Sequence, residues 1–335
     1  MNFLPRLVTT MTPLRITFAG GGTDIEEFYK QRNGSVVSTT IDKYIYVTVK
    51  KHSKIFEEEY RLSYSKTEHV DIIENIENDI ARECLKLVKI DPPLFISTVA
   101  DLPASSGLGS SSSFAVGLLY ALHQMKGEDV SAGQLAEEAC EIELVKLKRS
   151  IGKQDQYAAA YGGLNYISFR SDNSVLIESL STNSNNVKDA LNNSGLVWTG
   201  IKRDAGKILE KQISNMKNRS DCMDQIKSLS CLTRKKAKEG SLNAKSIGDI
   251  LDKGWHLKRK LSDNVSNREI DDLYERMKVH GIYGGKISGA GGGGFLYIVG
   301  NKEIMRKIRE KESDLEIINI KHEPRGARVI CRIEM

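Results

Sequence analysis

The sequence predicts an α+β protein built from two lobes. Short apolar or alternating runs typical of strands are mixed with longer amphipathic stretches typical of helices, and the two kinds do not alternate regularly. A polar stretch at Ser181–Asn186 marks a boundary between two parts of a chain that is long enough to bury two cores. We therefore expect domains at residues 1–185 and 186–335.

The first part opens with two expected strands separated by a short helix. Pro13–Ala19 is an apolar run, Glu26–Gln31 is helical in pattern, and Asn33-Gly34 marks a turn. Residues alternate along Ser35–Lys50, which predicts a half-buried antiparallel strand. Its two faces carry Ile45, Val47 and Val49 on one side and Tyr44, Tyr46 and Thr48 on the other.

The pattern in the middle of the chain predicts a helix, a strand and two further helices. The expected ranges are Ile72–Lys89, Pro93–Val99, Ser110–Lys126 and Ser131–Lys148. Ser131 suits the N-cap of the last of these helices. The Ser110–Lys126 helix is expected to be sharply amphipathic, with one apolar face. That face comprises Phe114, Leu118, Leu122 and Met125, with Ala115 and Leu119 beside it.

The remaining elements follow in a similar mixture. A segment of polar and small residues at Ile151–Gly163 precedes strands at Leu164–Phe169 and Val175–Leu180. Beyond the boundary we expect a strand at Gly195–Thr199 and a series of amphipathic helices to Val279. A glycine-rich hairpin, a strand at Phe295–Val299, a helix at Lys302–Lys311 and terminal strands complete the chain.

Composition argues against several classes of function. Of 335 residues, 40% are hydrophobic and 28% charged, as in an ordinary soluble protein. The net charge of +5 is too small and scattered for a nucleic-acid partner, and no apolar run approaches the roughly 20 residues of a membrane span. Five cysteines without a C-x-x-C pair, and no apolar leader in the first ten residues, favour reduced thiols in the cytoplasm.

The segment from Pro103 to Ser112 joins an expected strand to an expected helix and predicts a phosphate-binding loop. The first N–H groups of a helix lack backbone partners and carry positive potential, which favours a bound phosphate. No Lys-Ser or Lys-Thr pair follows the glycines, so the loop is not a Walker A motif. The alternative is a flexible linker. The residues expected to bind the nucleotide are Pro103, Ser105, Ser106, Gly107, Leu108, Gly109, Ser110, Ser111 and Ser112.

Two more glycine-rich segments stand out. Arg15–Asp24 ends a strand in three glycines followed by Thr-Asp, and Lys286–Gly294 lies between a helix and a strand. Gly289, Gly291 and Gly294 formally satisfy G-x-G-x-x-G, but a strand follows where a dinucleotide site needs a helix. Such a loop instead suits close packing against a ligand or another loop, or is a plain tight hairpin.

Together these three segments resemble, in order, the motifs of the GHMP kinases, the superfamily of galactokinase, homoserine kinase, mevalonate kinase and phosphomevalonate kinase. The resemblance runs from Pro13 to about Val299, and its central motif is Pro-x-x-x-Gly-Leu-Gly-Ser-Ser. Three segments resemble the sequences of one branch of this superfamily, the sugar-1-kinases, which include heptose 7-phosphate kinases and fucokinase domains. These segments are Leu14–Asp24, Ile151–Tyr157 and Gly284–Phe295.

The resemblance implies a fold, cofactors and roles. It implies an N-terminal ATP-binding lobe related to ribosomal protein S5 domain 2, a ferredoxin-like C-terminal lobe, and ATP and Mg²⁺ as cofactors. Asp155 resembles the catalytic base that takes the proton of the sugar hydroxyl. Arg15 resembles the arginine that stabilises the transferring phosphoryl group. Ser111, or its neighbour Ser110 or Ser112, resembles the Mg²⁺-binding serine, and Glu143 resembles the acidic ligand, with Glu141 as a nearby competitor on another helix face.

Taken singly, these residues have structural interpretations. Asp155 also suits a cap of the turn at Gln156–Tyr161, and Arg15 suits a surface ion pair. The sugar is expected to contact the first glycine motif and the third. The residues assigned to it are Gly21, Gly22, Thr23, Asp24, Lys153, Gly289, Gly291 and Gly292.

The resemblance implies phosphorylation of the anomeric C1 hydroxyl of D-glycero-D-manno-heptose 7-phosphate. The product would be the 1,7-bisphosphate, for nucleotide-activated heptose used in surface polysaccharide. The partners are then a small sugar phosphate and ATP. Cations near the motifs that suit a second phosphate are Lys43, Lys153, Arg203 and Lys286. Another sugar, such as fucose, is the alternative substrate.

Two other classes of function remain open at this point. Ser150-Ile151-Gly152-Lys153 satisfies the S-x-x-K pattern of serine acyl-enzymes, and Ser262-Asp263-Asn264 supplies S-D-N, although no Lys-Thr-Gly follows. A non-catalytic nucleotide-binding regulator would also keep the phosphate loop.

Overall fold

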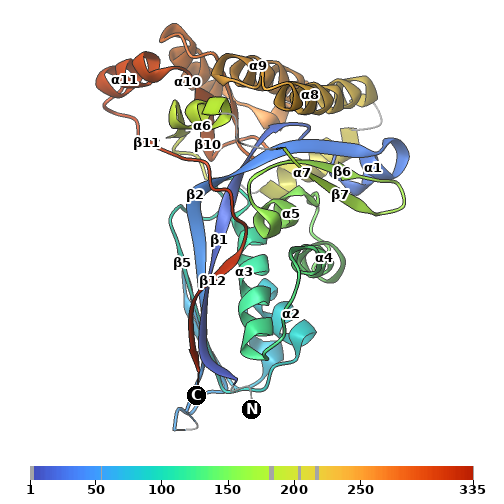
Figure 1. Cartoon of the computed structure of the whole chain (residues 1–335), viewed down its shortest axis with the longest axis vertical. Coiled ribbons are helices and arrows are strands. Elements are labelled where there is room, and N and C mark those ends of the chain that lie inside the picture. The colour runs from blue at the N-terminus through green and yellow to red at the C-terminus, as the bar shows by residue number, and fades with distance from the viewer. Residues whose placement is uncertain (1–3, 54, 181–184, 203–204, 216–218, 335) are drawn as a thin grey trace.

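A computed structural model describes residues 4–53, 55–180, 185–202, 205–215 and 219–334. In Figure 1 they form two lobes, each built on its own sheet, with both chain ends at the end of the molecule far from the helices of residues 220–311. The expected α+β class is confirmed. Within these ranges no helix is long and apolar enough to cross a membrane.

The first lobe is organised around an eight-stranded sheet in the described part of the chain. Its central strand, β2 (Gly34–Lys51), is long enough to pair with two different strands on the same side, one through each half of its length. The order is β12-β1-β2-β5-β3-β4, with β6 on the first half of β2 and β7 beyond it. The other strands are β1 (Pro5–Ala19), β3 (Tyr60–Ser63), β4 (Thr67–Val70), β5 (Leu94–Ala100), β6 (Leu164–Phe169), β7 (Val175–Ser179) and β12 (Arg328–Glu334).

The alternation expected in β2 is confirmed only in its second half. Ile45, Val47 and Val49 are buried there, whereas the intervening side chains are partly exposed. The first half, through Ile41, is buried on both faces because the strands of this lobe meet the helices of the second lobe there. Periodicity cannot reveal such two-sided burial in a strand with small polar residues.

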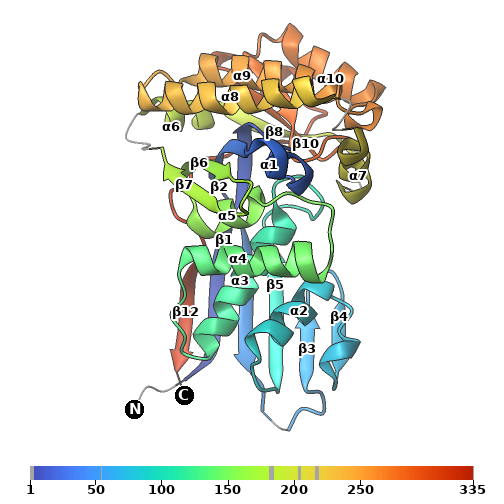
Figure 2. The same ribbon diagram turned by 90° about the vertical axis from the view of Figure 1, so that its right-hand side faces the viewer.

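Helices cover one face of this sheet (Figure 2). They are the 3₁₀ turn η1 (Ile73–Asn75), α2 (Asp79–Val88), α3 (Ser110–Met125), α4 (Ala132–Cys140), the π-helical turn η2 (Glu141–Lys146) and α5 (Gln154–Tyr161), whereas α1 (Glu26–Arg32) packs Phe28 against Met223 of the second lobe. Ser131 caps α4 as expected, accepting a hydrogen bond from the Gln134 N–H. Helix α3 packs against β1 and β2 and is itself covered by α2, α4 and α5.

Two expectations in this lobe are wrong. Helix α3 is not sharply amphipathic, because Val116 and Ala121, outside the expected face, are also fully buried between the sheet and the outer helices. The helix expected from Ile72 begins only at Asp79, where Asn78 accepts a hydrogen bond from the Ala81 N–H. Strands β3 and β4 were also missed, because each has only four residues in a largely polar stretch.

The second lobe has a four-stranded antiparallel sheet in the order β11-β8-β10-β9 within the described residues. These strands are β8 (Ser194–Trp198), β9 (Gly284–Ile287), β10 (Phe295–Val299) and β11 (Ile317–Ile318). The helices are α6 (Asn185–Asn192), α7 (Ala205–Asn215), α8 (Ser220–Lys238), α9 (Ala244–Arg259), the 3₁₀ turn η4 (Asp263–Val265), α10 (Arg268–Val279) and α11 (Lys302–Lys311). Helices thus separate β8 from β9 and β10 from β11, which is the βαββαβ layout of a ferredoxin-like lobe.

The last strand returns to the first lobe. Strand β12 pairs antiparallel with β1, and His322 forms an isolated bridge with Ile41 (Figure 1). The Glu323 carboxylate accepts hydrogen bonds from Tyr44 and Arg328, which hold this segment against the sheet. A division at residues 1–185 and 186–335 therefore remains a proposal, and the closing strand belongs to the first sheet.

A buried histidine joins α3 to α4 and makes stability depend on pH. The His123 ring meets Glu128 through Nδ1 at 2.6 Å and Glu138 through Nε2 at 2.8 Å. Burial lowers the pKa of His123, but the hydrogen bonds to Glu138 and Glu128 outweigh it, so that its pKa is raised. The stabilisation is therefore present below the unfolded pKa of about 6.5 and is lost as pH rises through the folded pKa.

His123→Gln is expected to lower the free energy of unfolding by about 1.5–3 kcal/mol at pH 6, the range for hydrogen bonds to charged groups. The difference from the parent should be smaller at pH 9, because the ring loses its charge as pH rises through its folded pKa. Urea unfolding at the two pH values measures it. Equal differences at pH 6 and pH 9 would contradict a charged His123.

Candidate active site

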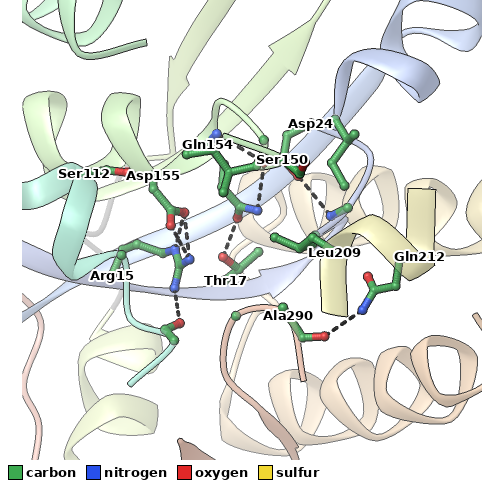
Figure 3. A pocket seen from close by; sticks show the side chains of 18 of the residues that line it. Arg15, Thr17, Asp24, Ser112, Ser150, Gln154, Asp155, Leu209, Gln212 and Ala290 are labelled. Carbon is green, nitrogen blue, oxygen red and sulfur yellow. Dashed lines mark hydrogen bonds and ion pairs between the residues drawn. The ribbon is translucent and has the colours of Figure 1, made fainter. Parts of the chain in front are cut away.

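A cavity of about 550 Å³ lies between the two lobes. Its walls come from the loop after β1, the loop before α3, the segment between η2 and α5, helices α7–α9, and the loop after β9 (Figure 3). All three glycine-rich segments singled out in the sequence therefore border one space.

The loop before α3 presents donors to the cavity. Ser105 and Gly107 have φ of 60° and 82°, and Gly109, with φ of 82°, is the N-cap of α3. This left-handed turn brings the first N–H groups of α3 to the cavity wall. The Ser106 and Ser110 hydroxyl oxygens are buried and have no hydrogen-bond partner among the described residues. Unpaired hydroxyls at a helix N-terminus fit the phosphate oxygens of a nucleotide.

Asp155 and Arg15 form a two-pronged ion pair at the centre of the cavity (Figure 3). Arg15 Nε and Nη2 each lie 2.7 Å from an oxygen of Asp155, and Nη1 donates to the Gly107 carbonyl at 2.7 Å. The Arg15 side chain is 6% exposed and that of Asp155 is 23% exposed. Asp155 thus does not cap α5, and its partly open carboxylate is held beside the phosphate loop.

Glu143 lies beneath the start of α3 and is fully buried. One carboxylate oxygen accepts from Ser111 and the other from Ser112 at 2.6 Å and Gln156 at 2.7 Å. Burial raises the pKa of Glu143, and the hydrogen bonds from Ser111 and Ser112 oppose this shift. Glu141 is partly exposed and pairs with Lys146 instead.

The residues around Glu143 suit a magnesium ion. A serine hydroxyl and a carboxylate are the hard oxygen donors that Mg²⁺ prefers, and it usually completes its shell with water and substrate phosphates. Ser111 is open to the cavity and contacts Glu143, whereas Ser112 is buried and Ser110 does not contact Glu143. The pair Ser111 and Glu143 therefore fits the ion best.

Asp24 is held at the other end of the cavity by a chain of hydrogen bonds (Figure 3). The Thr17 hydroxyl donates to Gln154 Oε1 at 2.6 Å, and Gln154 Nε2 donates to Asp24 Oδ2 at 3.0 Å. The Gly22 N–H donates to Asp24 Oδ1 at 2.9 Å. Burial, and then the nearby Asp155 carboxylate, raise the pKa of Asp24. Asp24 is thus oriented as a hydrogen-bonding group for a polar ligand.

The loop after β9 closes the cavity from the second lobe. A Cβ on Gly294 would lie 2.5 Å from the Ser106 carbonyl oxygen, so this loop packs its backbone directly on the phosphate loop, as one sequence interpretation expected. Lys286 on β9 lines the cavity near Arg15. Burial, together with the Arg15 charge, lowers the pKa of Lys286 to about 7.

Several expected site residues lie outside the cavity wall. Thr23 is fully buried, and its hydroxyl bonds the Gly20 carbonyl and the backbone of Ser35, which secures the glycine turn. The Lys153 ammonium lies over the Tyr29 ring, 5.0 Å from its centroid. The others are Pro103, which is exposed, Leu108, which is buried in the core, and Gly291 and Gly292, which pack against Val265, Asn264 and Ile208.

The candidate cations for a second phosphate differ in whether they line the cavity. Lys43 pairs with Asp42 and does not line the cavity, and Arg203 lies outside the described residues. Lys286 remains at the wall.

The cavity also contains residues that sequence reasoning did not assign. Gln154 stands in the quoted Gly-Lys-Gln-Asp-Gln motif, and its place before Asp155 was the available signal. Arg149 and Lys258 lie outside the quoted motif segments, so no motif pointed to them. Gln212 of α7 donates to the Ala290 carbonyl at 2.8 Å and ties that helix to the loop after β9 (Figure 3).

Comparison with known proteins gives consistent matches. The model of the GHMP kinases N terminal domain matches residues 71–163, and that of the GHMP kinases C terminal domain matches 235–313. The chain is 33% identical over 310 residues to a D-glycero-alpha-D-manno-heptose 7-phosphate kinase from Campylobacter jejuni, covering 87% of this chain and 89% of that protein. It is 26% identical over 350 residues to a bifunctional fucokinase/GDP-fucose pyrophosphorylase from Arabidopsis thaliana, covering 95% of this chain and 32% of that protein.

A solved structure agrees over almost the whole length. The crystal structure of a D-glycero-D-manno-heptose 1-phosphate kinase from Bacteroides thetaiotaomicron superposes with a TM-score of 0.79 at 23% identity. The match covers 97% of this chain and 99% of that one. The two-lobed architecture is therefore shared.

Proposed function

The chain belongs to the GHMP kinase family, and from this premise we propose that it phosphorylates the C1 hydroxyl of D-glycero-D-manno-heptose 7-phosphate with ATP. Membership confirms the resemblance carried by the three motifs and, together with the 33% identical heptose kinase, makes the protein a sugar kinase, a phosphotransferase with an alcohol acceptor. The specific sugar is supported by the 33% identical heptose 7-phosphate kinase. We place the reaction in the cytoplasm, where ATP is available.

One observation carries the catalytic part of the proposal: Asp155 and Arg15 are paired beside the phosphate loop, inside the cavity. Asp155 accepts the proton of the sugar hydroxyl as its oxygen attacks the γ-phosphorus and the bond to the ADP leaving oxygen breaks. Arg15 holds Asp155 in place and stabilises the charge that develops on the transferring phosphoryl group.

The other residues position the two substrates. The N-terminus of α3 and the Ser106 and Ser110 hydroxyls hold the nucleotide phosphates. Ser111 and Glu143 would hold Mg²⁺, which neutralises phosphate charge when bound. Asp24 hydrogen-bonds the hydroxyls of the sugar, oriented by Gln154.

A phosphorylated acceptor is supported by cations beyond those at the nucleotide end. Lys258 of α9 lines the cavity and donates to the Gly289 carbonyl. It follows Leu257, which joins an apolar cluster with Ile25 and Met223 next to the Asp24 loop. Lys258 and Lys286 are therefore our candidates for the 7-phosphate of the sugar.

Heptose 7-phosphate is expected to show at least a 100-fold higher kcat/KM than fucose, mannose or galactose, because a partly buried cation of the cavity pairs with its phosphate. Lys258→Met should raise the KM for heptose 7-phosphate at least tenfold and leave the affinity for ATP unchanged. Lys245→Met is the matched control, since Lys245 pairs with Asp249 on the same helix outside the cavity. A preference for an unphosphorylated sugar would refute the heptose 7-phosphate assignment and retain the sugar kinase.

The contacts of Ser150 and Lys153 do not support a serine acyl-enzyme. Ser150 lines the cavity, but the Lys153 ammonium lies over Tyr29, and no hydrogen bond joins the two side chains in the described part of the chain. Family membership instead accounts for this segment as the one that carries Asp155.

A further inference from the structure

Arg149 shares the oxygens that suit the magnesium ion. Its Nη1 lies 3.1 Å from Ser111 Oγ and 3.3 Å from Glu143 Oε1. Its Nη2 lies 2.9 and 3.0 Å from the two oxygens of Asp79, at the start of α2. The guanidinium therefore bridges a buried carboxylate and a half-exposed one.

The position of Arg149 allows this guanidinium to reach a ligand. The side chain is 30% exposed and lines the cavity next to the phosphate loop. Its backbone is fixed, because the Arg149 N–H donates to the Glu143 carbonyl at 2.9 Å. Arg15, by contrast, is already committed to Asp155 and Gly107.

Two cations cannot use the same two oxygens at once. A divalent ion bound to Ser111 and Glu143 repels the guanidinium, and Nη1 must then leave both groups. Asp79 still holds Nη2, so the guanidinium stays at the wall beside the phosphate loop. The anions that it meets there are the phosphate oxygens of the nucleotide.

We propose that Arg149 is a nucleotide-phosphate ligand that exchanges Ser111 and Glu143 for phosphate oxygens when the nucleotide binds, with or without magnesium, and that magnesium needs the same two groups. The proposal rests on nucleotide binding at the phosphate loop, which is part of the proposed function, and is independent of the sugar. It assigns Arg149 two effects. The residue supports nucleotide binding in the absence of metal, and it competes with the metal for Glu143.

The test is the affinity for ADP by titration calorimetry, once with excess EDTA and once with excess MgCl₂. Arg149→Met is expected to weaken ADP binding in EDTA at least tenfold, because a charge-assisted contact to phosphate is lost. In MgCl₂ the loss should be smaller, because the metal gains free access to Glu143. The dissociation constant in EDTA divided by that in MgCl₂ should therefore be at least fivefold larger for Arg149→Met than for the parent.

Arg276→Met is the matched control. Arg276 lies on α10 away from the cavity, and it also bridges two carboxylates, those of Glu312 and Asp314. It should change neither dissociation constant. Should Arg149→Met fail to fold, Arg149→Lys keeps the charge without the planar fork and should give an intermediate affinity in EDTA.

ADP affinity of folded Arg149→Met within twofold of the parent in EDTA would overturn the proposal and leave Arg149 as a structural ion pair. The nucleotide-binding function would stand, since the parent protein would still bind ADP. A parent protein that bound no ADP under either condition would overturn both.

Discussion

Asp155→Asn is expected to lower kcat by at least 100-fold, and up to about 10⁴-fold, the range for a lost general base. Asparagine has nearly the same shape but cannot accept the proton of the sugar hydroxyl. Its oxygen still accepts one hydrogen bond from Arg15, so the cavity wall should persist. The affinity for ATP should stay within about threefold, because Asp155 is paired with Arg15 and not with the serines of the phosphate loop.

Steady-state kinetics with heptose 7-phosphate and calorimetry with ATP measure the two quantities separately. Asp272→Asn serves as the control, since Asp272 is an exposed acid of α10 that pairs only weakly with Arg268. A kcat of Asp155→Asn within fivefold of the parent would remove Asp155 from the role of base.

Arg15→Lys is expected to lower kcat by about 10²–10³-fold, as when one preorganised transition-state donor is removed. Lysine keeps the charge but cannot bond both oxygens of Asp155 and the Gly107 carbonyl in one plane. The Asp155 carboxylate would then lose its fixed orientation, and the transferring phosphoryl group would lose the planar donor that we propose for it. The KM for ATP should change much less than kcat.

Burst kinetics and steady-state kcat at saturating substrates measure this loss. Arg61→Lys is the control, because Arg61 lies over the Phe95 ring on the outer part of the first sheet. If Arg15→Lys raised the KM for ATP and left kcat unchanged, Arg15 would act in ground-state binding alone.

Much of the fold followed from periodicity and local signals. The strand at Leu164–Phe169 and the cap at Ser131 agree with expectation because each depends on adjacent residues. The two-sided burial of α3 and the short strands β3 and β4 were not predictable, since what covers a residue depends on elements distant in the chain. The return of β12 to β1 joins residues more than 300 positions apart.

In the site, too, some features were predictable from the sequence and others depended on elements distant in the chain. The motif resemblance pointed to Arg15, Asp155, Ser111 and Glu143, and the structure brings all four to the same region. The motif resemblance could not reveal that Thr23 secures a turn or that the Lys153 ammonium lies over the Tyr29 ring. Nor could it reveal that Arg149 contacts Ser111 and Glu143.

By itself, the sequence determined the class of fold, the glycine- and serine-rich turn before a helix and the residue types available for phosphoryl transfer, because these depend on short spacings and local backbone chemistry. Only the tertiary structure decided which side chains meet. Arg15 and Asp155 come from a strand and a helix separated by 140 positions, and their 2.7 Å contacts exist because β1 and α5 pack against each other. Charge and hydrogen bonding act over a few ångströms, so the chemistry of this site depends on packing that no local pattern encodes.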